Sequence, residues 1–151
     1  MKTQAKSTLY ETDFNSWLEQ TAIILKAGKL NQLDIENLLE EIEGMSRKEK
    51  DALESNLIRV LQHLLKWNYQ PGKRSPSWSY TIIEHSRRLN KVLKNSPSLK
   101  PYFDTVFDEC YNEACKAAAV ETQLPLTTFP ESSPFTKSDV LDVNVDDYFI
   151  E

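Results

Sequence analysis

The residues of this chain that could bind a metal ion are three glutamates and a histidine. Glu36, Glu40 and Glu43 recur at i, i+4 and i+7, so in a helix they form one line beside an apolar stripe. Two such carboxylates and a histidine from a neighbouring helix could hold a divalent cation inside a bundle, which makes Glu36, Glu40 and His63 a candidate metal site. The alternative is a solvated acidic face directed at a basic helix, because the Glu-x-x-His motif of di-iron bundles is missing from the sequence.

Sequence signatures of catalysis and of cofactor binding are missing as well. The chain has no Gly-x-Ser-x-Gly motif, no P-loop and no glycine-rich dinucleotide turn, and it contains 3 Gly in 151 residues. His63 and His85 are the only histidines and have no convergent partners in the sequence, so structural roles are favoured for both. Cys110 and Cys115 point about 140° apart on one helix, which predicts two free thiols. We expect no catalytic residue and no cofactor, and an enzymatic activity is disfavoured.

The segment 66–80 concentrates aromatic and basic side chains between two amphipathic helical patterns. A connection of this kind either fixes two helices together or presents a contact surface. The structural interpretation is a clasp, in which aromatic rings close over the end of the bundle. Its predicted residues are Trp67, Tyr69, Pro71 and Trp78. Arg74 is expected either to lie on an indole face or to pair with an acid of an earlier helix.

The charge of the chain is unevenly distributed. Between Arg59 and Lys94 there are eight Lys or Arg and a single acid, Glu84, although the whole chain has a net charge of −5. Such an asymmetry can steer an acidic partner, unless acids of the same chain neutralise it. The basic residues proposed to contact a partner are Lys73, Arg74, Arg87, Arg88 and Lys91. Nucleic-acid contact through segment 66–94 is a weaker alternative, because the chain as a whole is acidic with a pI near 5.2.

The elements that must position these residues are helices. The scarcity of Gly, prolines confined to joints and the absence of alternating apolar and polar runs predict an all-α fold. We expect a single domain over residues 1–151, a bundle of about five helices with a flexible segment at 1–9. The predicted helices cover about 13–28, 32–44, 46–69, 76–95 and 97–122, with an extended strap and acidic tail over 124–151. Gly44 and a capping box from Ser46 to Glu49 predict the break between the second and third helices.

Several segments of the chain together resemble a known family. The matching segments are Tyr10–Phe14 with Trp17, Ala27–Leu30, Leu33–Leu38, Glu40–Glu43, His63–Trp67, Gln70–Pro71, Arg74, Ser77–Trp78, Ser96–Leu99, Glu121–Thr122, Leu124–Pro125, Phe129–Pro130 and Pro134–Thr136. Over about 10–142 the chain resembles domain of unknown function twenty-nine, a family of small helical bacterial proteins common in photosynthetic bacteria. Ser133 departs from this family, where many members have Cys, which argues against an essential thiol there. The resemblance implies an all-α fold and a cytoplasmic protein, and it implies no activity.

The leading functional hypothesis is a non-enzymatic interaction or regulatory protein. Its partner would be another protein or a second copy of the chain, with the metal-binding bundle and the nucleic-acid contact as alternatives. No run of about 18 apolar residues is present, so we expect no membrane span. The first residues lack the apolar core of a signal peptide, which favours a cytoplasmic location.

Overall fold

The computed structural model describes residues 9–151, and all of its regular elements in this range are helices. The chain divides into two compact units, one ending at Lys48 and one formed by Glu49–Glu151. The all-α class is therefore confirmed. The prediction of a flexible segment at 1–9 lies, apart from residue 9, outside the described residues.

The N-terminal unit, residues 9–48, contains α2 (Phe14–Lys26), the 3₁₀ turn η1 (Leu30–Gln32) and the beginning of α3 (Ile35–Tyr69). Asp13 caps α2, because its side chain accepts a hydrogen bond from the amide of Ser16 at 3.0 Å. Gly28 ends the helix with a φ of 70°, a left-handed conformation that glycine adopts without strain. These local signals confirm the predicted first helix.

α3 corrects the prediction of two helices separated at Gly44. It runs without interruption for 35 residues from Ile35 to Tyr69, so Gly44 and Ser46 are interior positions. A glycine inside a helix costs only about 1 kcal/mol relative to alanine, which good helix formers on both sides can offset. The Ser46–Glu49 pattern that predicted a capping box therefore does not start a new helix here.

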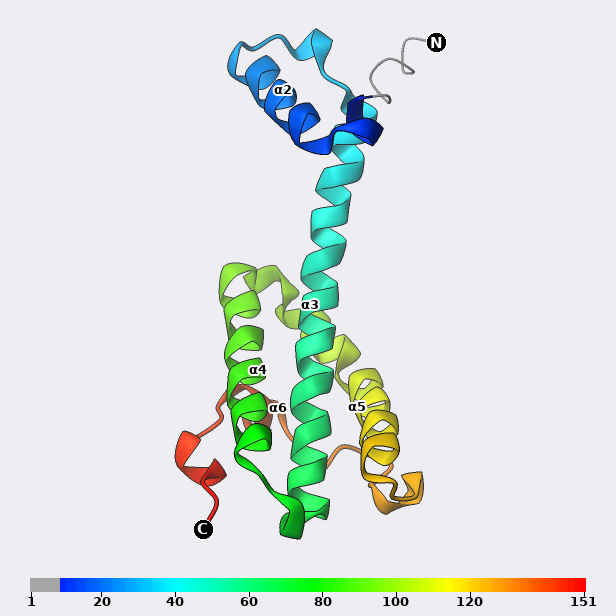
Figure 1. The fold of residues 1–151 in the computed structure, drawn as a ribbon, viewed down its shortest axis with the longest axis vertical. Coiled ribbons are helices and arrows are strands. Elements are labelled where there is room, and N and C mark those ends of the chain that lie inside the picture. Colours follow the sequence, from blue (N-terminus) through cyan, green and yellow to red (C-terminus); the bar gives the residue numbers. More distant parts are fainter. Residues whose placement is uncertain (1–8) are drawn as a thin grey trace. The chain divides into compact units, whose positions relative to one another are not determined.

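The C-terminal unit packs α4 (Pro76–Asn95) and α5 (Lys100–Thr122) on either side of the second part of α3 (Figure 1). Ser75 caps α4 by accepting a hydrogen bond from the amide of Trp78, and Pro76 occupies the first turn of this helix, which was predicted over 76–95. The short turns η2 (Pro71–Lys73) and η3 (Pro97–Leu99) precede α4 and α5. The core consists of large apolar side chains from all three helices, among them Leu53, Leu57, Leu61, Leu65, Ile82, Leu89, Phe103 and Val106.

The C-terminal strap crosses from the end of α5 to α4 (Figure 1) and contains η4 (Leu126–Thr128), α6 (Lys137–Leu141) and η5 (Val145–Tyr148). Phe129, Phe135 and Val140 of the strap are buried in the core. Side chains of the helices satisfy its carbonyl groups: Tyr111 donates to the oxygen of Pro130 at 2.7 Å, and Ser86 donates to that of Val140 at 2.6 Å. The strap is thus a docked part of this unit.

Candidate functional site

Trp67, at the end of α3, is enclosed by residues from two distant parts of the chain. The guanidinium carbon of Arg74 lies 4.5 Å from the centre of its ring, and Arg74 Nε donates to the Trp67 carbonyl oxygen at 2.9 Å. On the strap, Tyr148 packs its ring edge-to-face on Trp67 with the centroids 5.1 Å apart. Of the two roles expected for Arg74, the structure shows the one on an indole face.

Lys66 is the polar centre of the same region, although only 2% of its side chain is exposed. Its Nζ lies 4.5 Å from the centre of the Trp78 ring and 2.8 Å from a carboxylate oxygen of Glu121 at the end of α5. Gln62 donates to the other oxygen of that carboxylate at 2.6 Å. Burial alone would raise the pKa of Glu121, but the hydrogen bonds from Lys66 and Gln62 outweigh it and lower this pKa. Lys66 therefore joins all three long helices of the C-terminal unit.

The other two residues of the predicted clasp lie in the same region. Tyr69 packs edge-to-face on Phe129 of the strap with the ring centroids 5.5 Å apart, and Pro71 begins the turn η2. Trp67 and Trp78 each have a cation on a ring face, so those faces are not free to stack on bases as a nucleic-acid platform would require.

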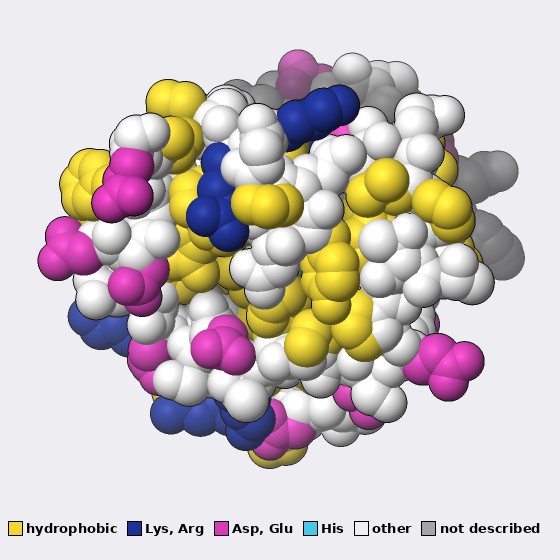
Figure 2. Space-filling model, turned by 90° about the horizontal axis from the view of Figure 1, so that it is seen from below, with side chains coloured by type: hydrophobic (Ala, Val, Ile, Leu, Met, Phe, Trp, Pro, Cys, Tyr) yellow, Lys and Arg dark blue, Asp and Glu magenta, His cyan; other side chains and the backbone are white. Residues whose placement is uncertain are grey.

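The groove beside this region has a volume of about 300 Å³. It lies between the start of α4 and the C-terminal residues, and is lined by Pro76, Ser79, Ile83, Val145, Tyr148, Phe149 and Ile150. Figure 2 looks onto this end of the molecule and shows hydrophobic side chains gathered across it.

His63 lies one turn before Trp67 and is buried. Its Nδ1 donates to the carbonyl oxygen of Arg59 at 3.0 Å, because a carbonyl can only accept. Burial, together with the neighbouring charge of Lys66, lowers the pKa of His63 to about 4. This imidazole is therefore neutral at pH 7.

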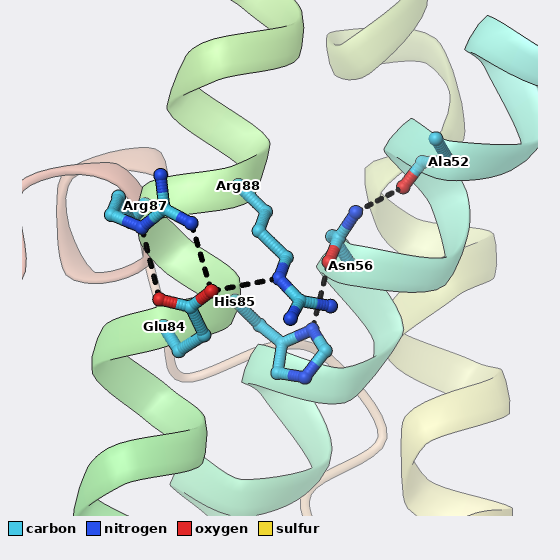
Figure 3. A network of polar contacts seen from close by, with 6 residues as sticks. All are labelled: Ala52, Asn56, Glu84, His85, Arg87 and Arg88. Atoms are coloured by element: carbon cyan, nitrogen blue, oxygen red, sulfur yellow. Dashed lines mark hydrogen bonds and ion pairs between the residues drawn. The ribbon is translucent and has the colours of Figure 1, made fainter.

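The five basic residues predicted to contact a partner have different surroundings. Arg87 and Arg88 both donate to Glu84 on their own helix, and these bonds lower the pKa of Glu84 to about 2 (Figure 3). Arg74 covers Trp67, as described above. Lys73 and Lys91 are exposed and make no ion pair within residues 9–151. These two side chains are the ones left available to an acidic partner.

A second polar network connects α4 to α3 (Figure 3). Asn56 uses its amide nitrogen to donate to the Ala52 carbonyl oxygen at 2.8 Å, so its amide oxygen accepts from His85 Nδ1 at 2.7 Å. In the neutral ring this arrangement places the proton on Nδ1 and leaves Nε2 as an acceptor. Burial and the nearby charges of Arg88 and Arg59 lower the pKa of His85. The network fixes both the orientation of the imidazole and its tautomer.

The predicted metal ligands are distributed over the two units. Glu36 and Glu40 belong to the N-terminal unit and His63 to the C-terminal unit. Glu40 lies 3.2 Å from Arg47 in an exposed ion pair. Over residues 9–151 no group of three or more His, Cys, Asp and Glu side chains is suited to hold a metal ion. The structure thus does not bring the predicted ligands together.

The two cysteines lie on α5, and a cavity is found near one of them. Both thiols are free and buried, as predicted. Burial raises the pKa of Cys110 to about 12 and also raises that of Cys115, so both are protonated at neutral pH. Cys115 lines a cavity of about 400 Å³ under η4, and a cavity of about 700 Å³ lies between α5 and the strap. In the second cavity Lys137 already pairs with Asp104.

The most unusual surface belongs to the N-terminal unit. Only Trp17 and Thr21 are buried among residues 9–48. Nine large hydrophobic side chains of this unit are exposed: Phe14, Leu18, Ile23, Leu25, Leu30, Ile35, Leu39, Ile42 and Met45. The apolar stripe beside Glu36, Glu40 and Glu43 is therefore an exposed surface of this unit.

Comparison with known families identifies the chain. Residues 9–146 match the family model described as Domain of unknown function DUF29, which covers most of the chain. The chain belongs to this family. Neither the curated proteins nor the solved structures contain a significant match to it.

The DUF29 match includes both units, so the exposed apolar surface and the clasp belong to the same family domain. In the part of the chain that the structure describes, no helix is long and apolar enough to cross a membrane. The line of glutamates that was interpreted as a metal site or a solvated acidic face runs beside this exposed surface, because Ile35, Leu39 and Ile42 are each followed directly by a glutamate.

Proposed function

We propose that this DUF29 protein is a non-enzymatic interaction protein and that its N-terminal unit, residues 9–48, is the module that docks a partner. The proposal rests on one observation, the nine large hydrophobic side chains that this unit exposes. Contiguous exposed apolar surface on a folded protein is a mark of an interaction site, whereas isolated exposed hydrophobic residues are common. The C-terminal unit has more than twice as many residues and exposes six large hydrophobic side chains.

A docked partner would complete a unit that has little core of its own. Among residues 9–48, α2 and the first part of α3 bury only one Trp and one Thr, so this unit gains little free energy from burial. Covering an interface of ordinary size, about 800 Å² on each partner, would add the missing apolar contacts. We include a cytoplasmic location in this proposal, in keeping with two free thiols.

Site-specific photo-cross-linking in cells tests this function. We would introduce benzoylphenylalanine in place of Leu39 and, in a second variant, in place of Val120, which is even more exposed but lies on α5 of the C-terminal unit. The expected result is a discrete cross-linked protein from position 39 that is absent from position 120. Position 39 without a cross-link, or with the same products as position 120, would contradict the proposed function.

A further inference from the structure

The exposed part of α3 carries an apolar stripe with an acidic border. Ile35, Leu39 and Ile42 are spaced at i, i+4 and i+7, which places them on one face of the helix, and they are 64%, 51% and 54% exposed. The stripe from residue 35 to 45 extends about 16 Å along the helix axis, which matches about three turns of a partner helix.

The border consists of Glu36, Glu40 and Glu43. Each follows one residue of the stripe, so the carboxylates form a parallel line about 100° around the helix. All three are exposed. Glu40 pairs with Arg47, whereas Glu36 and Glu43 make no ion pair within residues 9–151. The border therefore presents uncompensated negative charge beside the apolar stripe.

This charge decides which occupant fits the stripe. Residues 9–48 contain eight acids and four bases, so a second copy of the unit would bring like charges together across the interface. Like charges opposed in an interface are unfavourable, whereas opposite charges favour association and fix orientation. A helix whose apolar face is bordered by Lys or Arg complements both the apolar stripe and its acidic border.

We propose that this surface of α3 binds a basic amphipathic helix of another protein, with Ile35, Leu39 and Ile42 in contact with its apolar face. Glu36 and Glu43 then face its Lys or Arg side chains. The inference rests on the proposed docking function and specifies the chemistry of the partner. Helix-in-groove recognition of this kind takes its affinity from the apolar residues and its selectivity from the charged border.

Synthetic helices provide the test. The probe is a fluorescent Leu/Lys peptide of about 18 residues with apolar residues at i, i+3, i+4 and i+7. A Leu/Glu peptide of the same pattern and a Leu/Lys peptide of scrambled order serve as matched probes. We expect the full chain to bind the patterned Leu/Lys peptide at least about tenfold more tightly than either control peptide in about 0.1 M salt. Equal binding of the three peptides, or no binding of the Leu/Lys peptide, would overturn the inference.

Variants of the protein separate this surface from general electrostatic attraction. Ile42→Ser should weaken binding of the Leu/Lys peptide about tenfold, and Val120→Ser should leave it unchanged. The double change Glu36→Lys with Glu43→Lys should reverse the preference in favour of the Leu/Glu peptide. The double change Glu109→Lys with Glu113→Lys alters the net charge equally on exposed positions of α5 and should preserve the preference. The same reversal by the α5 variant would contradict a site on α3.

Sedimentation velocity distinguishes this inference from the function on which it rests. The free chain should remain a monomer over the concentration range of the peptide experiment. A dimer that Ile42→Ser dissociates would overturn the basic helix as occupant while retaining the docking function. If benzoylphenylalanine at position 39 gives no cross-link in cells, the docking function itself is contradicted, whatever the peptides do.

Discussion

The two parts of α3 carry similar apolar stripes but have opposite surroundings. In the C-terminal unit, Leu53, Leu57 and Leu61 are 0% exposed beneath α4, α5 and the strap. In the N-terminal unit, the stripe of Ile35, Leu39 and Ile42 remains more than half exposed. The same helical periodicity thus forms a core in one unit and a surface in the other. Amphipathicity shows which side chains favour burial, and the elements packed around the helix determine whether those side chains are buried.

Paired truncations should reveal this contrast most strongly. Leu57→Ala leaves a cavity in a closely packed core and should lower the free energy of unfolding by about 2–5 kcal/mol. Leu39→Ala removes a side chain that is already half exposed and should lower it by less than about 1 kcal/mol. Urea unfolding followed by circular dichroism measures both. A loss as large for Leu39→Ala as for Leu57→Ala would mean that the stripe is covered in the isolated chain.

Protonation of His63 should produce the next largest effect, and it is confined to the core of the C-terminal unit. Because burial lowers the folded-state pKa of His63 to about 4, the unfolded chain binds this proton more tightly than the folded one. Stability is therefore full above the unfolded pKa of about 6.5 and falls as the pH decreases towards 4, by about 2–3 kcal/mol in all.

The matched variant His63→Gln isolates this contribution. Its unfolding free energy should depend less on pH than that of the original chain between about pH 6.5 and 4. Hydrogen bonds from Arg87 and Arg88 lower the folded-state pKa of Glu84 to about 2, so its contribution to stability begins to decline as the pH falls towards the unfolded value of about 4.3. This decline is common to both proteins, and the difference between their profiles therefore reports His63. Parallel pH profiles for the two proteins would show that the protonated imidazole is tolerated in its buried site.

The buried Lys66 should contribute more to the free energy of unfolding than a surface lysine in an ion pair of similar length. Lys66→Met keeps most of the apolar stem but removes the ammonium group from Trp78 and Glu121. We expect Lys66→Met to lower the free energy of unfolding by about 1 kcal/mol. The lost cation–π and ionic contacts outweigh the gain from no longer burying a charged group. The control is Lys116→Met. The ion pair of Lys116 with Glu113 is exposed, so its removal should change the free energy of unfolding by close to zero. Equal losses of unfolding free energy in the two variants would show that Lys66 contributes no more to stability than a surface lysine.

Local chemistry explains which elements the sequence predicted well. Ser75 with Pro76, at the start of α4, and Gly28, after α2, each specify a helix end through atoms within a few residues, and the structure has helix ends at both. The predicted break at Gly44 was wrong because a glycine weakens a helix by only about 1 kcal/mol and does not end it.

Contacts between distant residues explain what the sequence did not reveal. Lys66 belongs to the segment 66–94 that was considered for nucleic-acid contact. Its partner Glu121, however, lies 55 positions later in the chain, and the burial of Lys66 depends on the packing of three helices. Tyr148 on Trp67 is a contact of the same kind. Covering Ile35, Leu39 and Ile42 would require a surface outside the helical pattern itself, which no periodicity within the chain can specify.

Two glycines of the N-terminal unit give the smallest expected effects, and they have opposite signs. Gly44 lies inside α3, where an added Cβ would meet only Arg47 at 3.5 Å, an ordinary contact. Gly44→Ala should therefore stabilise this unit by about 0.5–1 kcal/mol and slow hydrogen exchange of the amides near residues 40–48.

Gly28 has space for a Cβ but a φ of +70°, so Gly28→Ala should destabilise the unit by about 1 kcal/mol. If Gly44→Ala accelerated exchange instead, α3 would have to bend or open at Gly44, and the apolar stripe could then close on its own unit. Stabilisation by Gly44→Ala together with destabilisation by Gly28→Ala would instead support a continuous α3, on which the stripe remains exposed.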